Sequence, residues 1–176
     1  MFFNPQPLFV IIGYPNSGKK KMLQELFERK HFFPMKEPFL PAVFSNRFVV
    51  VNRTNRRHTS SALCVHISQV LHRHTLSAPA CMVMLSFILD QGERDIRKVL
   101  PYLEDSGCRL HYLVLAGSWS DKRFIGEQDL EFLKTGIKRG RIHYFDLLVT
   151  RSPPRFQQRT IAVAQVIRAV LDGSCR

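Results

Sequence analysis

Continuous apolar runs and helix-spaced apolar stripes alternate along the whole chain. The runs are bounded by turn residues and predict buried strands over residues 8–12, 47–52, 80–89, 110–116 and 142–149. The stripes predict helices over residues 19–30, 60–76, 94–103 and 128–137, and a final helix that two prolines open at residue 153. This alternation is typical of an α/β fold: a mainly parallel sheet with helices on both faces, in three layers.

Prolines interrupt the pattern at two places. Three of them fall within residues 31–41, which therefore predict an extended loop with at most a short edge strand. Pro101 is expected to interrupt the last turn of the helix over 94–103. No internal repeat and no long linker divides the sequence, so we expect one domain over residues 1–176.

The stretch between the first strand and the first helix carries the clearest chemical signal. It has the pattern G-x-x-x-x-G-K in the strand–loop–helix context of a phosphate-binding loop. In such a loop, backbone N–H groups and the lysine bind phosphate oxygens. The candidate residues are Gly13, Asn16, Ser17, Gly18, Lys19 and Lys20. Lys20 stands where a Ser or Thr hydroxyl normally holds Mg²⁺, and an ammonium group cannot ligate a cation.

The net charge indicates the kind of partner, and the cysteines indicate the compartment. The net charge is +12 with a pI of about 10.1, which favours nucleic acid, an acidic protein or anionic lipid as a partner. The four cysteines form no C-x-x-C pair and predict reduced thiols in a nuclear or cytoplasmic protein: Cys64, Cys81, Cys108 and Cys175. No signal peptide and no apolar run long enough to span a membrane is expected.

A second stretch lies where a nucleotide-binding protein of this layout would read the base. Residues 113–121 run from an apolar strand into Ser118-Trp119-Ser120-Asp121 and a charged loop. Together with the G-x-x-x-x-G-K loop, this arrangement resembles the Ras-like small GTPases over nearly the full length. The resemblance implies that Asp121 corresponds to the aspartate that binds guanine. Trp119 replaces the lysine of that motif; it could stack on a base or contact a protein partner.

The middle of the chain departs from that family. Small GTPases carry Asp-x-x-Gly after the next strand, for Mg²⁺ and the γ-phosphate, and the matching place here is Asn52-Arg53-Thr54-Asn55. No acidic residue occurs from residue 38 to 89, and no glycine lies between residues 19 and 91. Three charge-assisted contacts at about 1.5–3 kcal/mol each are lost, which weakens nucleotide binding by roughly four to six orders of magnitude. We expect a pseudo-GTPase without a cofactor or a Mg²⁺ site, at most binding guanine nucleotide or phosphate weakly.

The last third of the chain resembles the centromere protein M family, which comprises non-catalytic, small-GTPase-like subunits of the inner kinetochore. The resemblance rests on residues 144–149 and 159–168 and on the overall length. It implies a nuclear scaffold subunit without catalytic activity.

Aromatic and basic residues gather in the segments that a nucleotide would order in a GTPase. Because so short a loop cannot bury all of these aromatics, we expect them to be exposed interface anchors. The expected partner-binding residues are Phe32, Phe33, Phe39, Phe44, Arg53, Arg56 and Arg57. The expected partner is a protein subunit of a heteromeric complex with an acidic surface, and nucleic acid is at most a secondary contact.

Two other functions compete with this interpretation. Asp90 follows an apolar run as a Walker B aspartate does, which would suit a nucleotide kinase or ATPase; as an alternative, it caps the following helix. The many basic residues would suit a nucleic-acid-binding module, although no aromatic RNA motif or zinc spacing accompanies them. If the loop has no ligand, Lys19 is expected to be solvated and Lys19→Ala to leave the melting temperature nearly unchanged.

Overall fold

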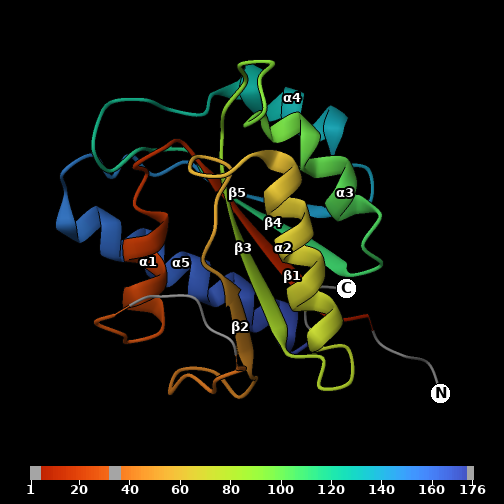
Figure 1. Cartoon of the computed structure of the whole chain (residues 1–176). Helices are drawn as coiled ribbons and strands as arrows, with labels where there is room; N and C mark the ends of the chain where they lie inside the picture. The colour runs from red at the N-terminus through yellow and green to blue at the C-terminus, as the bar shows by residue number, and fades with distance from the viewer. Residues whose placement is uncertain (1–4, 32–36, 174–176) are drawn as a thin grey trace.

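The structure, a computed structural model, describes residues 5–31 and 37–173. Strands and helices alternate along the chain (Figure 1). The strands are β1 (Pro7–Gly13), β2 (Phe48–Val51), β3 (Ala80–Ser86), β4 (Arg109–Leu115) and β5 (Arg141–Phe145). The helices are α1 (Lys19–Leu26), α2 (Ser60–Arg73), a 3₁₀ turn η1 (Ile96–Lys98), α3 (Leu100–Glu104), α4 (Glu127–Gly136) and α5 (Pro153–Leu171).

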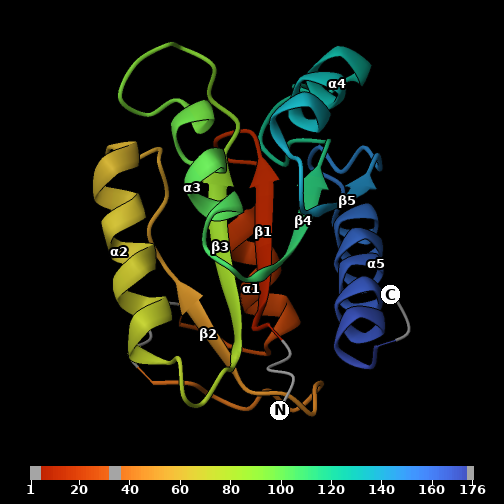
Figure 2. The same cartoon turned by 90° about the vertical axis from the view of Figure 1, so that its right-hand side faces the viewer.

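The five strands form one parallel sheet in the order β2-β3-β1-β4-β5. Helices α2, α3 and α4 cover one face, and α1 and α5 cover the other, as Figures 1 and 2 show from two directions. This arrangement confirms the predicted α/β class with three layers. β1 is the central strand, and helices cover both of its faces. Its residues are therefore apolar throughout and do not alternate between apolar and polar.

The side chains of β1 divide the core into two halves. Leu8, Val10 and Ile12 point toward α2, α3 and α4, and Phe9 and Ile11 point toward α1 and α5. All five side chains are fully buried. The continuous apolar run in the sequence is therefore two interleaved apolar faces.

The ends of several elements differ from the prediction. Helix α1 ends at Leu26 rather than residue 30, and Glu28 follows in a left-handed conformation with φ 52°. Strand β3 ends at Ser86, so the apolar residues after it belong to a loop. Pro101 lies in the first turn of α3 and does not interrupt a last turn. In the first turn of a helix the N–H group that proline lacks has no partner within the helix, so its loss costs little.

Aromatic residues of the loop before β2 pack onto the protein. Phe39 pairs with Phe48 in an isolated bridge, and its ring meets the edge of Phe27 at 5.1 Å. Phe44 is buried against the same two rings. The expectation that these aromatics are exposed is therefore wrong for Phe44, and Phe39 is only partly exposed. Phe32 and Phe33 lie outside the described residues.

The parallel arrangement brings five loops to the carboxyl edge of the sheet. The loop after β1 leads to α1 on one face, whereas the loops after its neighbours β3 and β4 lead to α3 and α4 on the other. Such divergence opens a crevice, which is where open α/β sheets bind ligands. Over the described ranges, no helix has the length and apolar character that a bilayer crossing demands.

A histidine pair lies in the sheet itself. The His111 ring packs against Phe9 and His143 with centroid distances of 5.6 Å each, and its Nδ1 lies 3.3 Å from His143 Nε2. His111 is buried, and its Nε2 has no hydrogen-bond partner among the described residues. Burial, followed by the charges of His143, Arg109 and Arg141, lowers the pKa of His111 from 6.5 to about 4.

We expect His111 to make the fold sensitive to acid. Between pH 6.5 and 4 the unfolded chain binds a proton that the folded chain does not, so the free energy of unfolding falls as the pH falls, by at most about 1.4 kcal/mol per unit. Urea unfolding at several pH values should show a shallower acid slope for His111→Phe than for the wild type. His72→Phe, at an exposed position on α2, should keep the wild-type slope. Equal slopes for His111→Phe and the wild type would contradict the assignment.

Candidate functional site

The loop between β1 and α1, residues 14–18, is fixed by its two flanking glycines. Gly18 has φ 88°, and a Cβ there would lie 2.7 Å from Phe156 Cε2 and 3.3 Å from Trp119 Cβ. A Cβ on Gly13 would lie 2.6 Å from Ser17 Oγ. The left-handed conformation and the close contacts explain why glycine occupies both positions.

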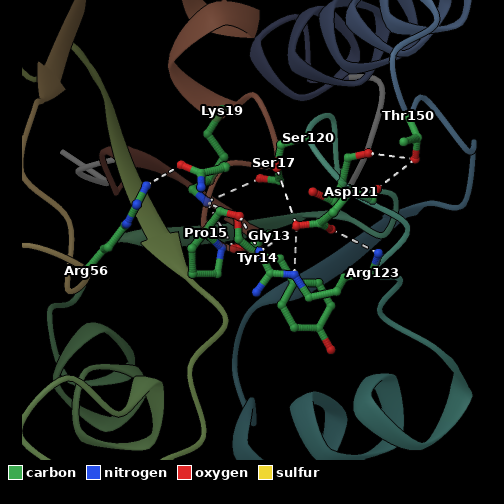
Figure 3. Close-up of polar contacts among 12 residues, drawn as sticks. Gly13, Tyr14, Pro15, Ser17, Lys19, Arg56, Ser120, Asp121, Arg123 and Thr150 are labelled. Atoms are coloured by element: carbon green, nitrogen blue, oxygen red, sulfur yellow. Dashed lines mark hydrogen bonds and ion pairs between the residues drawn. The ribbon is translucent and has the colours of Figure 1, made fainter.

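Lys19 points back into this loop instead of into solvent. Its Nζ donates to Gly13 O and Tyr14 O at 2.9 Å each and to Ser17 Oγ at 3.2 Å (Figure 3). Only 7% of the residue is exposed, so the expectation of a solvated Lys19 is wrong. Burial, followed by the charges of Arg56, Arg159 and Arg123, lowers its pKa to about 7.

Three arginines from distant segments bind the remaining acceptors of the loop. Arg159 of α5 donates from Nη2 to Ser17 O at 2.9 Å, and from Nη1 to Gly117 O at 2.6 Å. Arg123 donates to Pro15 O at 3.0 Å, and Arg56 binds the Asn16 side chain. Together with Lys19, these arginines give every residue from 13 to 17 a cationic hydrogen-bond donor.

Arg159 is the least expected of these residues. The side chain is 1% exposed, and burial lowers its pKa from 12.5 to about 10. The sequence alone does not distinguish it from the other basic residues of the last helix. The only signal that could have identified it is its position in line with Phe156 and Val163 on the buried stripe of α5.

A cavity of about 500 Å³ opens beside the loop, at the carboxyl ends of β1 and β3. Met84, Ser86 and Trp119 contribute to its walls. Six cationic side chains also line it: Lys19, Lys20, Lys21, Arg53, Arg56 and Arg57. None of the lining residues is acidic.

No ion pair among the described residues neutralises the cations of this cavity. All fourteen Asp and Glu residues of the chain fall within the described ranges. They form three ion pairs there, centred on Asp95, Asp121 and Glu131, and none involves a cation of the cavity. The side chains of Lys20, Arg53 and Arg57 make no hydrogen bond or ion pair with a described residue. The cavity is therefore a concentration of uncompensated positive charge.

A buried amide positions the arginines of the turn after β2. Asn55 is fully buried, and its side chain binds Ser86 N at 2.7 Å, Ser86 O at 2.9 Å and Arg94 O at 2.7 Å. The adjacent residues Arg53, Arg56 and Arg57 are exposed. The resemblance drawn from the sequence expects the GTPase glycine at Asn55, and a positioning role for this residue was not predicted.

The two residues expected at a guanine base have other partners. Lys21 Nζ lies 4.0 Å from the centre of the Trp119 ring, whose edge packs on Phe156 with a centroid distance of 5.0 Å. Asp121 accepts three hydrogen bonds from Arg123, which, with a smaller effect of Ser118, lower the pKa of its carboxyl group. Trp119 lines the cavity, whereas Asp121 does not.

The donor set around the loop does not suit a divalent cation. A hard cation such as Mg²⁺ needs several oxygen ligands, usually including carboxylates. The nearest strand end provides Ser86, and the next side chain after Lys19 is an ammonium group. Nowhere in residues 5–31 and 37–173 do three His, Cys, Asp or Glu side chains gather in a way that could hold a metal.

Asp90 lies away from this cavity. It is exposed, four residues beyond the end of β3, and its Oδ1 accepts a hydrogen bond from Gly92 N at 2.8 Å. The contact closes a turn, and it is Asp95 that caps η1 by accepting from Arg97 N. Neither carboxylate lines the cavity.

Comparison with known proteins does not assign the chain to a family. No protein-family model matches the sequence, and no curated protein matches it. The functional argument therefore depends on the residues themselves.

Lys19→Ala should lower the stability of the protein, because it removes three hydrogen bonds and a buried stem. We expect a loss of about 1–3 kcal/mol in the free energy of unfolding. Lys20→Ala changes an exposed neighbour whose side chain makes no hydrogen bond or ion pair with a described residue, and should stay within about 0.5 kcal/mol of the wild type. Equal melting temperatures for the wild type and Lys19→Ala would contradict the hydrogen-bonded position of Lys19.

The same pair of variants tests the lowered pKa of Lys19. Above pH 7 the folded chain loses the Lys19 proton, whereas the unfolded chain keeps it up to 10.5. Stability should therefore rise with pH in this window, and the deficit of Lys19→Ala should be larger at pH 8.5 than at pH 6.5. Burial raises the pKa of Cys81 above its ordinary 9.0, which opposes the trend near that pH. Because both proteins contain Cys81, this effect cancels in the deficit. A deficit that is constant with pH would show that Lys19 keeps its proton.

Proposed function

We propose that this chain is a degenerate phosphate-loop protein of the small-GTPase class that does not hydrolyse nucleotide and acts as a protein-interaction subunit. The observation that carries the proposal is the hydrogen bonding of residues 13–17. Lys19, Arg56, Arg123 and Arg159 occupy the acceptors of the loop, so protein contacts order it. A nucleotide is not needed for that task.

The electrostatics of the cavity support the absence of hydrolysis. Phosphoryl transfer to water needs a metal ion across the β- and γ-phosphates and a residue that positions the attacking water. Here Lys20 stands in place of the metal-binding hydroxyl, and no carboxylate lines the cavity. Asp90, the residue on which a kinase or ATPase function would rest, points into its own turn.

The resemblance of residues 144–149 and 159–168 to the centromere protein M family suggests the kind of assembly. That family contributes subunits to the inner kinetochore, a nuclear complex. The second of these segments contains Arg159, which donates a hydrogen bond to Ser17 O in the loop after β1. We therefore propose a nuclear, heteromeric assembly, with the inner kinetochore as the first complex to examine.

The purified protein should not release phosphate from GTP or ATP, with or without Mg²⁺. Because cations replace the metal ligands, we expect a rate equal to that of Lys19→Ala, measured with a phosphate sensor. The ratio of absorbance at 260 and 280 nm should also indicate a protein without bound base. Phosphate release that depends on Mg²⁺ and disappears in Lys19→Ala would overturn the proposal.

Metal-independent nucleotide binding is the second candidate function. It is favoured by one observation, that exposed cations surround the cavity where Mg²⁺ would otherwise neutralise phosphate. A base on the Trp119 ring would have to displace the ammonium of Lys21. Quenching of Trp119, the only tryptophan, by GTP in the presence of EDTA would support this alternative.

Assembly should depend on exposed apolar residues near the loop before β2. Leu40 is 61% exposed and lies beside the partly buried Phe39, so it is better placed than Phe39 to contact a partner. We expect Leu40→Ser to reduce recovery of stoichiometric partners with the tagged chain from its native cells. Leu76→Ser, at a fully exposed leucine, is the matched control and should have no effect. A chain that is monomeric and recovers no stoichiometric partner would refute the subunit role.

A further inference from the structure

The cavity beside the β1–α1 loop combines an apolar wall with a cationic rim. Met84 and Trp119 contribute the apolar side chains. Lys20, Lys21, Arg53, Arg56 and Arg57 contribute the charges, and all five are exposed. Such a lining suits a ligand that carries several negative charges around an apolar group.

The position of Lys19 argues against a single small anion as the natural occupant. A phosphate in this kind of loop would need the lysine and the inward-facing N–H groups. Lys19 Nζ is already within hydrogen-bond reach of three acceptors of the loop itself, Gly13 O, Tyr14 O and Ser17 Oγ. Of the rim cations, Lys20, Arg53 and Arg57 have no side-chain hydrogen bond or ion pair with a described residue. Only a ligand with several charges can reach more than one of them.

The shape and the aromatic contacts distinguish a peptide from a nucleic acid. Nucleic-acid-binding proteins place their cations along an extended face and offer aromatic rings for stacking. Here the cations surround a cavity of about 500 Å³. The Trp119 ring is already covered by Lys21 and packed on Phe156. An acidic segment of protein can enter the cavity and form bidentate pairs with arginines.

We propose that this cavity binds an acidic segment of a partner protein, with Arg53 and Arg57 as the principal carboxylate-binding residues. The inference rests on the proposed subunit function and names the chemistry of one of its contacts. Asn55 fixes the turn that carries both arginines through its hydrogen bonds to β3 and Arg94. The backbone that carries both arginines is therefore fixed before the partner arrives, which reduces the entropy lost on binding.

A fluorescent synthetic peptide of Asp and Glu residues around one central Leu tests the proposal. It should bind the intact chain, change the emission of Trp119 and lose affinity as salt is raised. Its Asn and Gln counterpart should not bind. The double variant Arg53→Glu/Arg57→Glu should weaken binding by about tenfold or more. Arg73→Glu/Lys138→Glu makes the same charge change at the opposite edge of the sheet, where the residues lie outside the cavity, and should weaken binding much less.

Three outcomes would overturn the inference. The first is no binding of the acidic peptide, and the second is equal weakening in both double variants, which would indicate a non-specific charge effect. The third is tighter binding of single-stranded DNA or GTP than of the peptide, abolished by the Arg53/Arg57 variant. Melting temperatures of both variants must match the wild type, as expected for exposed residues. If native assembly survives while peptide binding fails, this inference is wrong but the proposed subunit function stands.

Discussion

The buried guanidinium group of Arg159 joins three parts of the chain that are far apart in sequence. It lies on α5, and it binds Ser17 O in the loop after β1 and Gly117 O in the loop after β4. Both terminal nitrogens of this buried cation donate to carbonyl groups, whereas its Nε has no partner among the described residues, so these two hydrogen bonds hold the loops and the helix together. The shape of the cavity edge, including the close approach of Phe156 to Gly18, depends on this contact.

The same contact changes the chemistry that the loop can perform. A phosphate-binding loop offers N–H groups to an anion. In this protein its oxygens, from Gly13 to Ser17, accept hydrogen bonds from four cationic side chains. These side chains thereby provide the positive charge that a metal ion would bring, and they order the loop as a bound nucleotide would. Burial, followed by the like charges of Arg56, Arg159 and Arg123, lowers the pKa of Lys19. The exposed cations Lys20, Arg53 and Arg57 remain available to a partner.

The order of elements could be predicted because each strand and helix carries its own periodicity. The buried run of β1 and the stripe of α5 follow directly from residue types. The ends of the elements could not be predicted equally well, because single residues decide them. Glu28 in a left-handed conformation ends α1 early, and the burial of Phe44 depends on the Phe27 and Phe48 rings that it meets only after folding.

The sequence by itself determined the α/β class, the G-x-x-x-x-G-K loop and the absence of carboxylates from residues 38–89, because composition and spacing are local properties. Only the tertiary structure decided what holds the loop. Arg159 and Arg123 reach it across 142 and 108 residues, and Asn55 reaches Ser86 across 31. Parallel strands bring their carboxyl ends to one edge regardless of distance along the chain. No local pattern distinguishes the cations that this edge buries from those that it leaves exposed.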